Sequence, residues 1–425
     1  MYKVAPVLLI AFAIAVFLPV ADAYDNGVLG ASGPPMGWST WCTEDLCGLL
    51  DRCTESEIMK RADALVEQGM DKMGYKWLFL DDCWADKERD SEGRLQGQPD
   101  QFPSGMKALA DYVHDKGLYL SLYTCIGTKT CKKNRPGSYG SFVTDANTFA
   151  DWGVDMVKCD NCHNPQKNET QALFTEFSQA LNDTNHEMLF ALCEWGEDEV
   201  WSEDFGPAIS QMFRVQMDHL PFFNWPPKAA GVGYGQGTNN VIDWMANIRP
   251  ATFAGPSAWA DPDFLMTLFD VVAATMPYTE SRTEFTFWAL WSSPLLVATD
   301  IIDLSDEKRS ILMNEDVLAI HKDPLFVSGD RFLYDDQTGT QVWQRPLSNG
   351  DVAVVIYNAD KNNNMDSKVV EFTFQQLRDA GLDVDDTMLV RDLWANEDLG
   401  SFTEKFSMGL KRHESQMYRL SKPQE

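Results

Sequence analysis

Apolar runs of strand length recur through most of this 425-residue chain, and each ends on a polar residue. The runs end at seven positions, 24 to 45 residues apart: Asp82, Tyr123, Asp160, Glu194, Asp218, Asp263 and Asp300. Stretches of helical period fill the intervals, for example from a capping box predicted at Thr54 and Glu57 up to Gly69. One strand and one helix per unit predict an α/β fold, a (β/α)8 TIM barrel whose strand ends line one catalytic mouth. Asp also favours turns, so a single acidic strand end is weak evidence and the series carries the prediction.

The pattern changes after residue 320. Apolar and polar residues alternate there in short runs, such as 351–357, separated by Asn, Gly and Asp. This alternation is typical of antiparallel strands and predicts a C-terminal antiparallel β-sandwich domain. We therefore expect a catalytic barrel over 24–320 and the sandwich over 321–425.

The first 23 residues form a third type of segment. A lysine at position 3 precedes an apolar run, and Ala21-Asp22-Ala23 has the small residues of a cleavage site. This pattern predicts a secretory signal peptide over 1–23. A membrane anchor is the alternative, but Pro6 and Pro19 interrupt the run. We expect a protein that is secreted or delivered to a lysosome or vacuole and has no membrane partner.

The charge balance narrows the class of ligand. The chain has 35 Lys and Arg residues against 64 Asp and Glu residues, a net charge of −29. This charge opposes binding to nucleic acid and to anionic lipid surfaces. A neutral or cationic ligand is expected.

The nine cysteines fit an exported protein with disulfides, and their odd number leaves at least one thiol unpaired. Cys159 and Cys162 have a metal-ligand spacing, but no second pair accompanies them, so no metal site is predicted. Asn168 and Asn182 begin glycosylation sequons.

Two charged pairs indicate the chemistry. Lys158 and Asp160 are two residues apart and so lie on one side of a strand, where the lysine favours the ionised carboxylate of a nucleophile. Arg214 and Asp218 end a later run, predicted as a strand over 212–218. Two carboxylates in one mouth are the requirement of a retaining glycosidase, in which one attacks the sugar and the other protonates the leaving oxygen.

Aromatic residues gather near the same strand ends. They are Trp38, Trp41, Trp84, Tyr123, Trp195, Trp201 and Trp259. Each tryptophan alone is more simply explained as core, but their repeated placement beside acidic residues favours stacking on sugar rings.

Several motifs now make the chain recognisable: they are Gly33-Pro-Pro-Met-Gly-Trp38, Leu80-Asp-Asp-Cys-Trp84, Lys158-Cys-Asp160, Cys193-Glu-Trp195, Asp261-Pro-Asp263, Asp323-Pro324 and Val342-Trp-Gln-Arg-Pro346. In this order they resemble the α-galactosidases (melibiases) of glycoside hydrolase family 27, over nearly the whole mature chain. The resemblance implies hydrolysis of terminal α-D-galactosides without a cofactor. It leaves the natural oligosaccharide and the choice between monomer and homodimer open.

The resemblance also implies residue roles. Asp160 matches the nucleophile and Asp218 the acid/base. The matched sugar contacts are Trp41, Asp81, Asp82, Tyr123, Lys158, Glu194, Trp195, Arg214 and Asp263, with Asp81 and Asp82 at O4 and O6 of galactose. Asp300 receives no role.

Three disulfides follow from the same resemblance: Cys42–Cys83, Cys47–Cys53 and Cys131–Cys162. Cys125, Cys159 and Cys193 then remain thiols.

Glu197 and Phe264 depart from residues common in the family and are expected at the rim of the pocket. The segment 221–240, rich in Pro, Gly and aromatic residues, is expected on the aglycone side.

Three alternative functions are less favoured than an α-galactosidase. An α-N-acetylgalactosaminidase is disfavoured by Glu194, where relatives of that specificity carry a small residue. A β-L-arabinopyranosidase is disfavoured by the intact Asp81 and Asp82. An inactive sugar-binding protein is disfavoured because both Asp160 and Asp218 are present.

Overall fold

The fold is described from a computed structural model for residues 33–42, 53–132, 134–224, 235–271, 274–360 and 367–423. The expected signal peptide, and Cys47 with it, lie outside these residues. Within them, no helix has the length and apolar character needed to cross a membrane.

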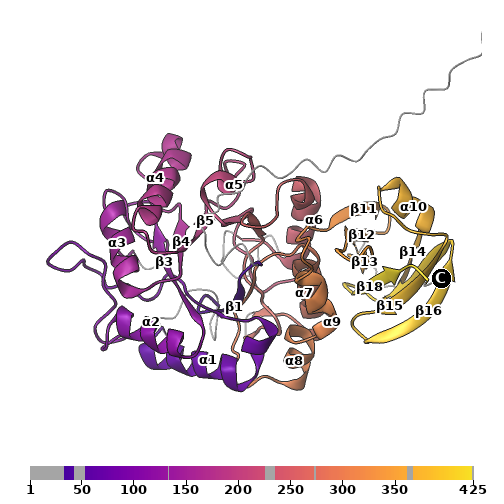
Figure 1. The fold of residues 1–425 in the computed structure, drawn as a ribbon, viewed down its shortest axis with the longest axis horizontal. Helices are drawn as coiled ribbons and strands as arrows, with labels where there is room; N and C mark the ends of the chain where they lie inside the picture. Colours follow the sequence, from indigo (N-terminus) through magenta and orange to yellow (C-terminus); the bar gives the residue numbers. More distant parts are fainter. Residues whose placement is uncertain are drawn as a thin grey trace, which may run out of the picture.

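A parallel eight-stranded sheet forms the first body of the molecule, shown from indigo to orange in Figure 1. Its strands are β1 (Met36–Ser39), β2 (Trp77–Leu80), β3 (Tyr119–Cys125), β4 (Met156–Asp160), β5 (Leu189–Cys193), β6 (Met212–Arg214), β7 (Trp259–Asp261) and β10 (Leu295–Val297). The strands pair in chain order from β1 to β7, and β10 pairs with β1. Leu265, just after β7, bridges to Val297 of β10 and brings the two ends of the sheet together. The predicted TIM-type barrel is confirmed.

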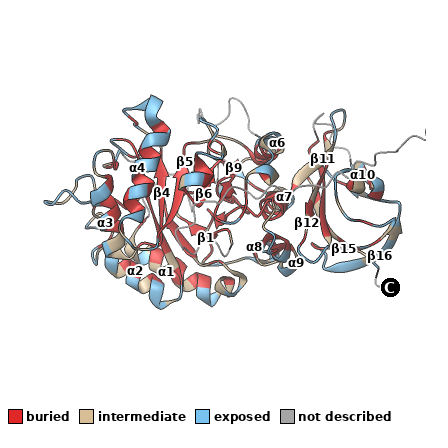
Figure 2. Cartoon of the chain, turned by 45° about the horizontal axis from the view of Figure 1, so that its top comes forward, coloured by how far each residue is buried: buried red, intermediate tan, exposed pale blue. Residues whose placement is uncertain are grey.

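Helices cover the outside of the barrel. They are α1 (Glu55–Glu67), α2 (Met106–Asp115), α3 (Phe142–Trp152), α4 (Thr170–Asn182), α5 (Gly206–Ile209), α6 (Thr238–Ile248), α7 (Tyr278–Leu290), α8 (Asp306–Leu312) and α9 (Glu315–His321). Short 3-10 turns at Met70–Met73, Lys167–Glu169 and Pro250–Thr252 and a hairpin of β8 (Asp270–Val271) and β9 (Ala274–Thr275) complete this body. Figure 2 shows buried strands inside and helices with exposed outer faces, as expected for a parallel sheet covered on its outside.

Two local predictions on these elements were wrong. Thr54 does cap α1, because its hydroxyl accepts from Glu57 N–H at 3.3 Å, but the Glu57 carboxylate binds Lys60 and Arg61, so no reciprocal capping box forms. The sixth strand ends at Arg214 and does not continue to residue 218.

The C-terminal part is antiparallel, as predicted. One sheet has the order β11 (Asp330–Asp335), β12 (Thr340–Pro346), β13 (Val352–Asn358), β18 (Ser415–Ser421), β15 (Thr387–Asp392) and β16 (Glu397–Thr403). The second sheet pairs β14 (Lys368–Thr373) with β17 (Lys405–Leu410), and α10 (Phe374–Asp379) follows β14. An apolar cluster that includes Ile356, Phe372 and Phe406 fills the space between the sheets.

The C-terminal sheet packs against the barrel along α7. The buried Arg345 of β12 donates from Nη1 to the carbonyl oxygens of Ala289 and Leu290 at 3.2 and 3.3 Å. Trp343 and Phe287 stack edge to face at 5.2 Å between ring centres. The sandwich therefore braces the helix that supports the last barrel strand, on the side away from α3 and α4 (Figure 1).

Candidate active site

A cavity of about 350 Å³ lies at the carboxyl ends of the barrel strands. It is lined by Trp41, Asp81, Asp82, Tyr123, Cys131, Lys132, Lys158, Asp160, Cys162, Trp195, Glu197, Arg214, Met217, Asp218 and Phe264. Nine of the eleven residues expected to act on the sugar are therefore brought together at one place. Glu194 and Asp263 lie behind the wall.

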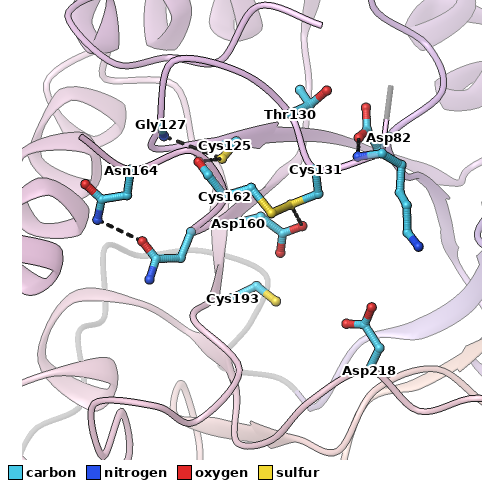
Figure 3. The surroundings of a disulfide bond; sticks show 12 residues. Asp82, Cys125, Gly127, Thr130, Cys131, Asp160, Cys162, Asn164, Cys193 and Asp218 are labelled. Atoms are coloured by element: carbon cyan, nitrogen blue, oxygen red, sulfur yellow. Dashed lines mark hydrogen bonds between the residues drawn. A yellow bond between two sulfur atoms is a disulfide. The ribbon is translucent and has the colours of Figure 1, made fainter. Parts of the chain in front are cut away.

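Asp160 ends β4 inside this cavity. The side chain is buried, and its Oδ1 accepts no hydrogen bond from the described residues. Its Oδ2 lies 3.2 Å from Sγ of Cys131, which is in a disulfide and has no proton to donate. Figure 3 shows the carboxylate between this disulfide and Cys193, with Asp218 facing the same space. Burial raises the pKa of Asp160 to about 6, although Lys158 opposes the rise.

Lys158 points into the cavity from the same face of β4, as the two-residue spacing predicts. Its Nζ donates to Asp81 Oδ2 at 2.8 Å, with both side chains buried. Burial lowers the pKa of Lys158, but the carboxylates of Asp81 and Asp160 outweigh burial and hold that pKa above its ordinary value. The lysine is therefore charged and fixes Asp81, rather than Asp160, by direct contact.

Strand register sets what surrounds the nucleophile. Cys125 of β3 pairs with Asp160, and Asp160 pairs with Cys193 of β5. Tyr123 pairs with Lys158 two residues earlier. The carboxylate therefore lies in a row between two buried cysteines.

Arg214, at the end of β6, joins the second carboxylate to the barrel. Its Nη2 lies 3.3 Å from Asp218 Oδ1 and 2.9 Å from Asp263 Oδ2. The buried guanidinium thus reaches Asp218 although β6 ends before that residue. The Asp218 side chain remains 17% exposed and open to the cavity.

Asp263 supports this arrangement from behind. Its Oδ2 also accepts from the backbone N–H of His219 at 2.6 Å, and Trp288 Nε1 donates to its carbonyl oxygen at 2.8 Å. Its φ of 80° is in the left-handed region, which a non-glycine residue adopts only where its surroundings enforce it. Burial raises the pKa of Asp263, whereas Arg214 lowers it. Asp263 thus contacts Arg214 behind the cavity wall, and its contact with sugar stays a prediction.

The prediction that the Glu194 side chain lines the pocket was wrong. Glu194 is fully buried, and its Oε2 accepts from the backbone N–H of Asp198 at 2.8 Å. Burial raises its pKa to about 8. Successive strand side chains alternate in direction, so the neighbouring Cys193 is the one that faces Asp160, and Arg214 Nη1 lies 3.7 Å from its sulfur.

Two residues of the cavity wall, Lys132 and Met217, were not predicted from the sequence. Lys132 follows the disulfide cysteine Cys131, its backbone N–H donates to Asp82 Oδ2 at 2.7 Å, and its Nζ lies 5.5 Å from the centre of the Trp41 ring. Met217 immediately precedes Asp218. Both residues are next in sequence to a predicted site residue, and this adjacency is the sequence signal that could have identified them. Glu197 and Phe264 line the cavity, as expected for rim residues.

The aromatic cluster proved to be mostly core. Trp38, Trp84 and Trp259 are at most 2% exposed, and Trp201 packs against Trp244 and Phe253. Of the seven aromatic residues, only Trp41, Tyr123 and Trp195 line the cavity.

Two of the three expected disulfides need correction. Cys83 bonds to Cys53, with the two Cα atoms 5.7 Å apart, so neither Cys42–Cys83 nor Cys47–Cys53 exists as predicted. The chain brings Cys53, just before α1, next to the end of β2, within the span of a disulfide. Cys42 is also in a disulfide, but its partner is not among the described residues.

Cys131–Cys162 is present, with Cα atoms 5.2 Å apart, and it forms part of the cavity wall. Cys125, Cys159 and Cys193 are buried thiols, as expected. Asn168 and Asn182 are exposed on and beside α4. No group of three metal-ligating side chains occurs in the described part of the chain.

Comparison with known proteins agrees with this site. Residues 33–323 match the family model for alpha galactosidase A, and residues 337–420 match the model for the alpha galactosidase C-terminal beta sandwich domain. A probable alpha-galactosidase from Dictyostelium discoideum is 36% identical over 406 residues, covering 96% of this chain and 95% of that protein.

Solved structures give the same result. Alpha-galactosidase I from Mortierella vinacea is 30% identical, with a TM-score of 0.82 over 92% of this chain and 97% of that chain. A Saccharomyces cerevisiae α-galactosidase solved with raffinose is 25% identical, with a TM-score of 0.81 over 92% of this chain and 98% of that one. Because a family model matches more than half of the chain and the relatives match along nearly all of it, this protein belongs to the α-galactosidases of glycoside hydrolase family 27.

Proposed function

We propose that this chain is a retaining exo-α-galactosidase that removes terminal α-D-galactosyl residues from oligosaccharides or glycoconjugates. The observation that carries the proposal is the placement of Asp160. It is a buried carboxylate whose Oδ1 makes no ion pair or N–H or O–H hydrogen bond to the described residues, and it shares a cavity with a second, more exposed carboxylate. Such a pair suits an acid and a nucleophile with different environments.

In the first step, Asp160 attacks the anomeric carbon and the glycosidic bond breaks. Asp218 gives its proton to the departing oxygen, so the leaving group departs as a neutral alcohol. In the second step Asp218 takes a proton from water, the resulting hydroxide attacks the anomeric carbon, and Asp160 leaves as a carboxylate. Two inversions return the α-configuration.

The remaining residues hold the sugar. Asp81 and Asp82 supply acceptors for hydroxyl groups, and each is itself fixed, Asp81 by Lys158 and Asp82 by the backbone of Lys132. Trp41 offers a ring face for the apolar side of galactose. The preset carboxylates lower the cost of ordering the site when substrate binds. No step requires a cofactor.

Glu194 does not account for specificity against N-acetylgalactosamine. Glu194 was expected to exclude the acetamido group, but its side chain is buried and does not line the cavity. Glu194 therefore does not separate the two substrates by direct contact in the cavity. Asp81 and Asp82 both line the cavity, which still disfavours an arabinopyranoside that lacks the C6 hydroxymethyl group.

Hydrolysis of nitrophenyl α-galactoside beside its N-acetylgalactosaminide and β-L-arabinopyranoside analogues tests the substrate. The α-galactoside is expected to have the highest kcat/KM, and preference for either analogue would overturn the assignment. NMR of the first product should show α-galactose, whereas β-galactose would contradict retention.

Asp218→Asn should slow substrates with poor leaving groups most, because these need the proton. An equal loss for good leaving groups would remove Asp218 as the acid.

We retain three further proposals from the sequence. They are the signal peptide at 1–23, the division of the chain at 320/321, and a destination that is secreted or lysosomal/vacuolar. The division falls at the last residue of α9, nine residues before β11 begins at Asp330. Size-exclusion chromatography with light scattering distinguishes a monomer from a homodimer.

A further inference from the structure

The proposed acid/base, Asp218, is followed by the segment 219–224, which lies against the residues that lead into α6. Gln236 N–H donates to the carbonyl oxygen of Asp218 at 2.7 Å. Farther along, Asn239 N–H donates to the carbonyl oxygen of Phe223 at 2.8 Å. Because these hydrogen bonds join the two stretches of backbone, a displacement of either stretch would also move Asp218.

The C-terminal domain contacts this segment through His413. The residue lies in the turn between β17 and β18 and is 5% exposed. Its ring stacks on Phe223, with 4.3 Å between the ring centres and 26° between the planes. Its Nε2 lies 3.1 Å from Asn224 Nδ2. Two successive residues of the segment 219–224 therefore contact one imidazole of the other domain.

The partners of His413 define how its ring binds. Glu280 of α7 accepts a hydrogen bond from Nδ1 at 2.6 Å, so this nitrogen carries a proton. Arg412 Nε and Asn224 Nδ2 are both donors, and each lies 3.1 Å from Nε2. Nε2 is therefore the acceptor. The imidazole thus joins α7 to the segment that follows Asp218.

The backbone of His413 is fixed as well. Its φ of 58° is in the left-handed region, which a non-glycine residue adopts where its surroundings enforce it. The hydroxyl of Thr283 in α7 donates to the His413 carbonyl oxygen at 2.7 Å. The His413 N–H donates to the carbonyl oxygen of Asn358 at 2.9 Å. The turn therefore presents the imidazole in one position.

A second residue of the sandwich, Tyr357 of β13, reaches the start of α6. It is fully buried, and its hydroxyl donates to Asn239 Oδ1 at 2.8 Å. Asn239 Nδ2 in turn donates to Asn224 Oδ1 at 3.0 Å. Tyr357 and His413 are therefore the two ends of one chain of hydrogen bonds, which runs through the two asparagines.

We propose that His413 and Tyr357 of the C-terminal domain are positioning residues for Asp218, the acid/base of the barrel. This inference rests on the proposed function. Asp160 is fixed within a strand, whereas Asp218 lies four residues beyond the end of β6 and needs support from elsewhere. Proton transfer depends on the position of the acid, so small displacements of Asp218 lower the rate.

The test compares two leaving groups by kcat/KM, which reports the first step. Dinitrophenol departs from its α-galactoside without a proton, whereas methanol needs one. His413→Ala should lower kcat/KM for methyl α-galactoside about tenfold, part of the roughly 10²- to 10⁴-fold effect of a general acid. The loss should be in kcat, with KM little changed. For the dinitrophenyl galactoside, kcat/KM should change less than about twofold, because no proton is needed.

Two milder variants refine this test. Tyr357→Phe removes one hydroxyl from a buried ring and should lower kcat/KM for the methyl galactoside about threefold, the effect of one neutral hydrogen bond. His413→Gln places an amide acceptor near the position of Nε2. It should return kcat/KM to within about threefold of the parent value, because Asn224 regains its partner.

The second step of hydrolysis gives an independent readout. With the dinitrophenyl galactoside, breakdown of the galactosyl-enzyme is expected to limit kcat, and this step needs Asp218 as the base. His413→Ala should therefore lower that kcat about tenfold. Azide attacks the anomeric carbon without a base, so it should restore the rate and yield α-galactosyl azide. A loss caused by partial unfolding would not respond to azide.

The matched control breaks a different contact between the two domains. Asp316 of α9 accepts from Arg391 Nε of β15 at 2.8 Å. Asp316→Ala should leave the ratio of the two kcat/KM values unchanged, because this ion pair joins α9 to β15 and not to the segment 219–224. A selective loss for the methyl galactoside in this control would overturn the inference.

The remaining outcomes are equally decisive. Equal losses for both galactosides in His413→Ala and Tyr357→Phe would show a general structural effect, and unchanged rates would show contacts that only join the domains. Either result overturns the inference. If His413→Ala does not fold, Tyr357→Phe decides. A parent protein that hydrolyses neither galactoside would overturn the proposed function, and the inference with it, before any variant is compared.

Discussion

Replacement of Asp160 by Asn should abolish turnover and, at neutral pH, make the protein more stable. The Asp160 side chain is 6% exposed, and its Oδ1 accepts no hydrogen bond from the residues described. The lysine of the same strand binds Asp81 by direct contact. Burial outweighs the favourable effects of the Lys158 charge and the Cys193 thiol on the pKa of Asp160, so the ionised carboxylate is a poorly compensated buried charge. Asparagine has nearly the shape of the protonated carboxyl group and does not ionise.

The magnitude follows from the pKa. Burial raises the pKa of Asp160 from 3.8 to about 6, a difference worth about 3 kcal/mol at about 1.4 kcal/mol per pH unit. Because the pKa is raised in the folded state, the protonated form supplies stability below pH 3.8 that is lost as the pH rises through about 6. The variant should match the parent protein at low pH, gain over it between these two values, and keep a gain of about 3 kcal/mol above them.

The assay is the unfolding free energy, or the thermal midpoint, of both proteins across this pH range. Asp218→Asn is the control, since Asp218 is partly exposed and lies 3.3 Å from Arg214, so its removal should bring no gain. A variant of Asp160 that is less stable than the parent at pH 7 would refute the reasoning. A gain that does not change with pH would also refute it, because it would not arise from ionisation.

Four further outcomes are expected. With Asp160 ionised only above a pKa of about 6, kcat/KM should fall about tenfold per pH unit below that value, and an unchanged rate at pH 5 would contradict this. Joint replacement of Cys131 and Cys162 by Ser opens a loop of 31 residues and should cost about 3 to 4 kcal/mol in unfolding experiments; a cost below 1 kcal/mol would show that the bridge adds little. Burial raises the pKa of Glu284 to about 8, so Glu284→Gln should be neutral at low pH and stabilising at pH 9, and a loss at pH 9 would contradict this. Gly37→Ala puts a Cβ 2.0 Å from a backbone oxygen of the next strand and should abolish soluble expression, while soluble, active protein would show that the strands can separate.

Most of the fold follows from periodicity. Parallel barrel strands are buried on both faces, so they are continuous apolar runs, and the helices between them carry one apolar face. Length is harder to predict, as β6 shows. The run over 212–218 has the composition of a strand, but the strand ends at Arg214, and one further backbone hydrogen bond joins Val215 N–H to the Asp261 carbonyl oxygen at 3.1 Å. That end depends on where β5 and β7 stop, which is not a local property of the sequence.

The site was predictable where strand position alone decides the direction of a side chain. Asp160 and Lys158 belong to this class, whereas Asp218 lies four residues beyond the end of β6 and still lines the cavity. Glu194 does not, because it follows the last residue of β5 and only the turn after the strand fixes its direction. Cysteine pairing is also non-local, since Cys53 meets Cys83 only when the start of α1 reaches the end of β2.

The positions of the two buried cations explain why one carboxylate stays reactive. Lys158 Nζ is 2.8 Å from Asp81, and Arg214 Nη2 is 2.9 Å from Asp263, so each cation contacts an aspartate other than the proposed nucleophile. A direct ion pair would engage the attacking oxygen of Asp160 and lower its pKa. Because Lys158 makes its direct contact with Asp81, its charge favours the ionised form of Asp160 without binding the attacking oxygen. The stability lost at Asp160 and the oxygen free for attack therefore have the same structural origin.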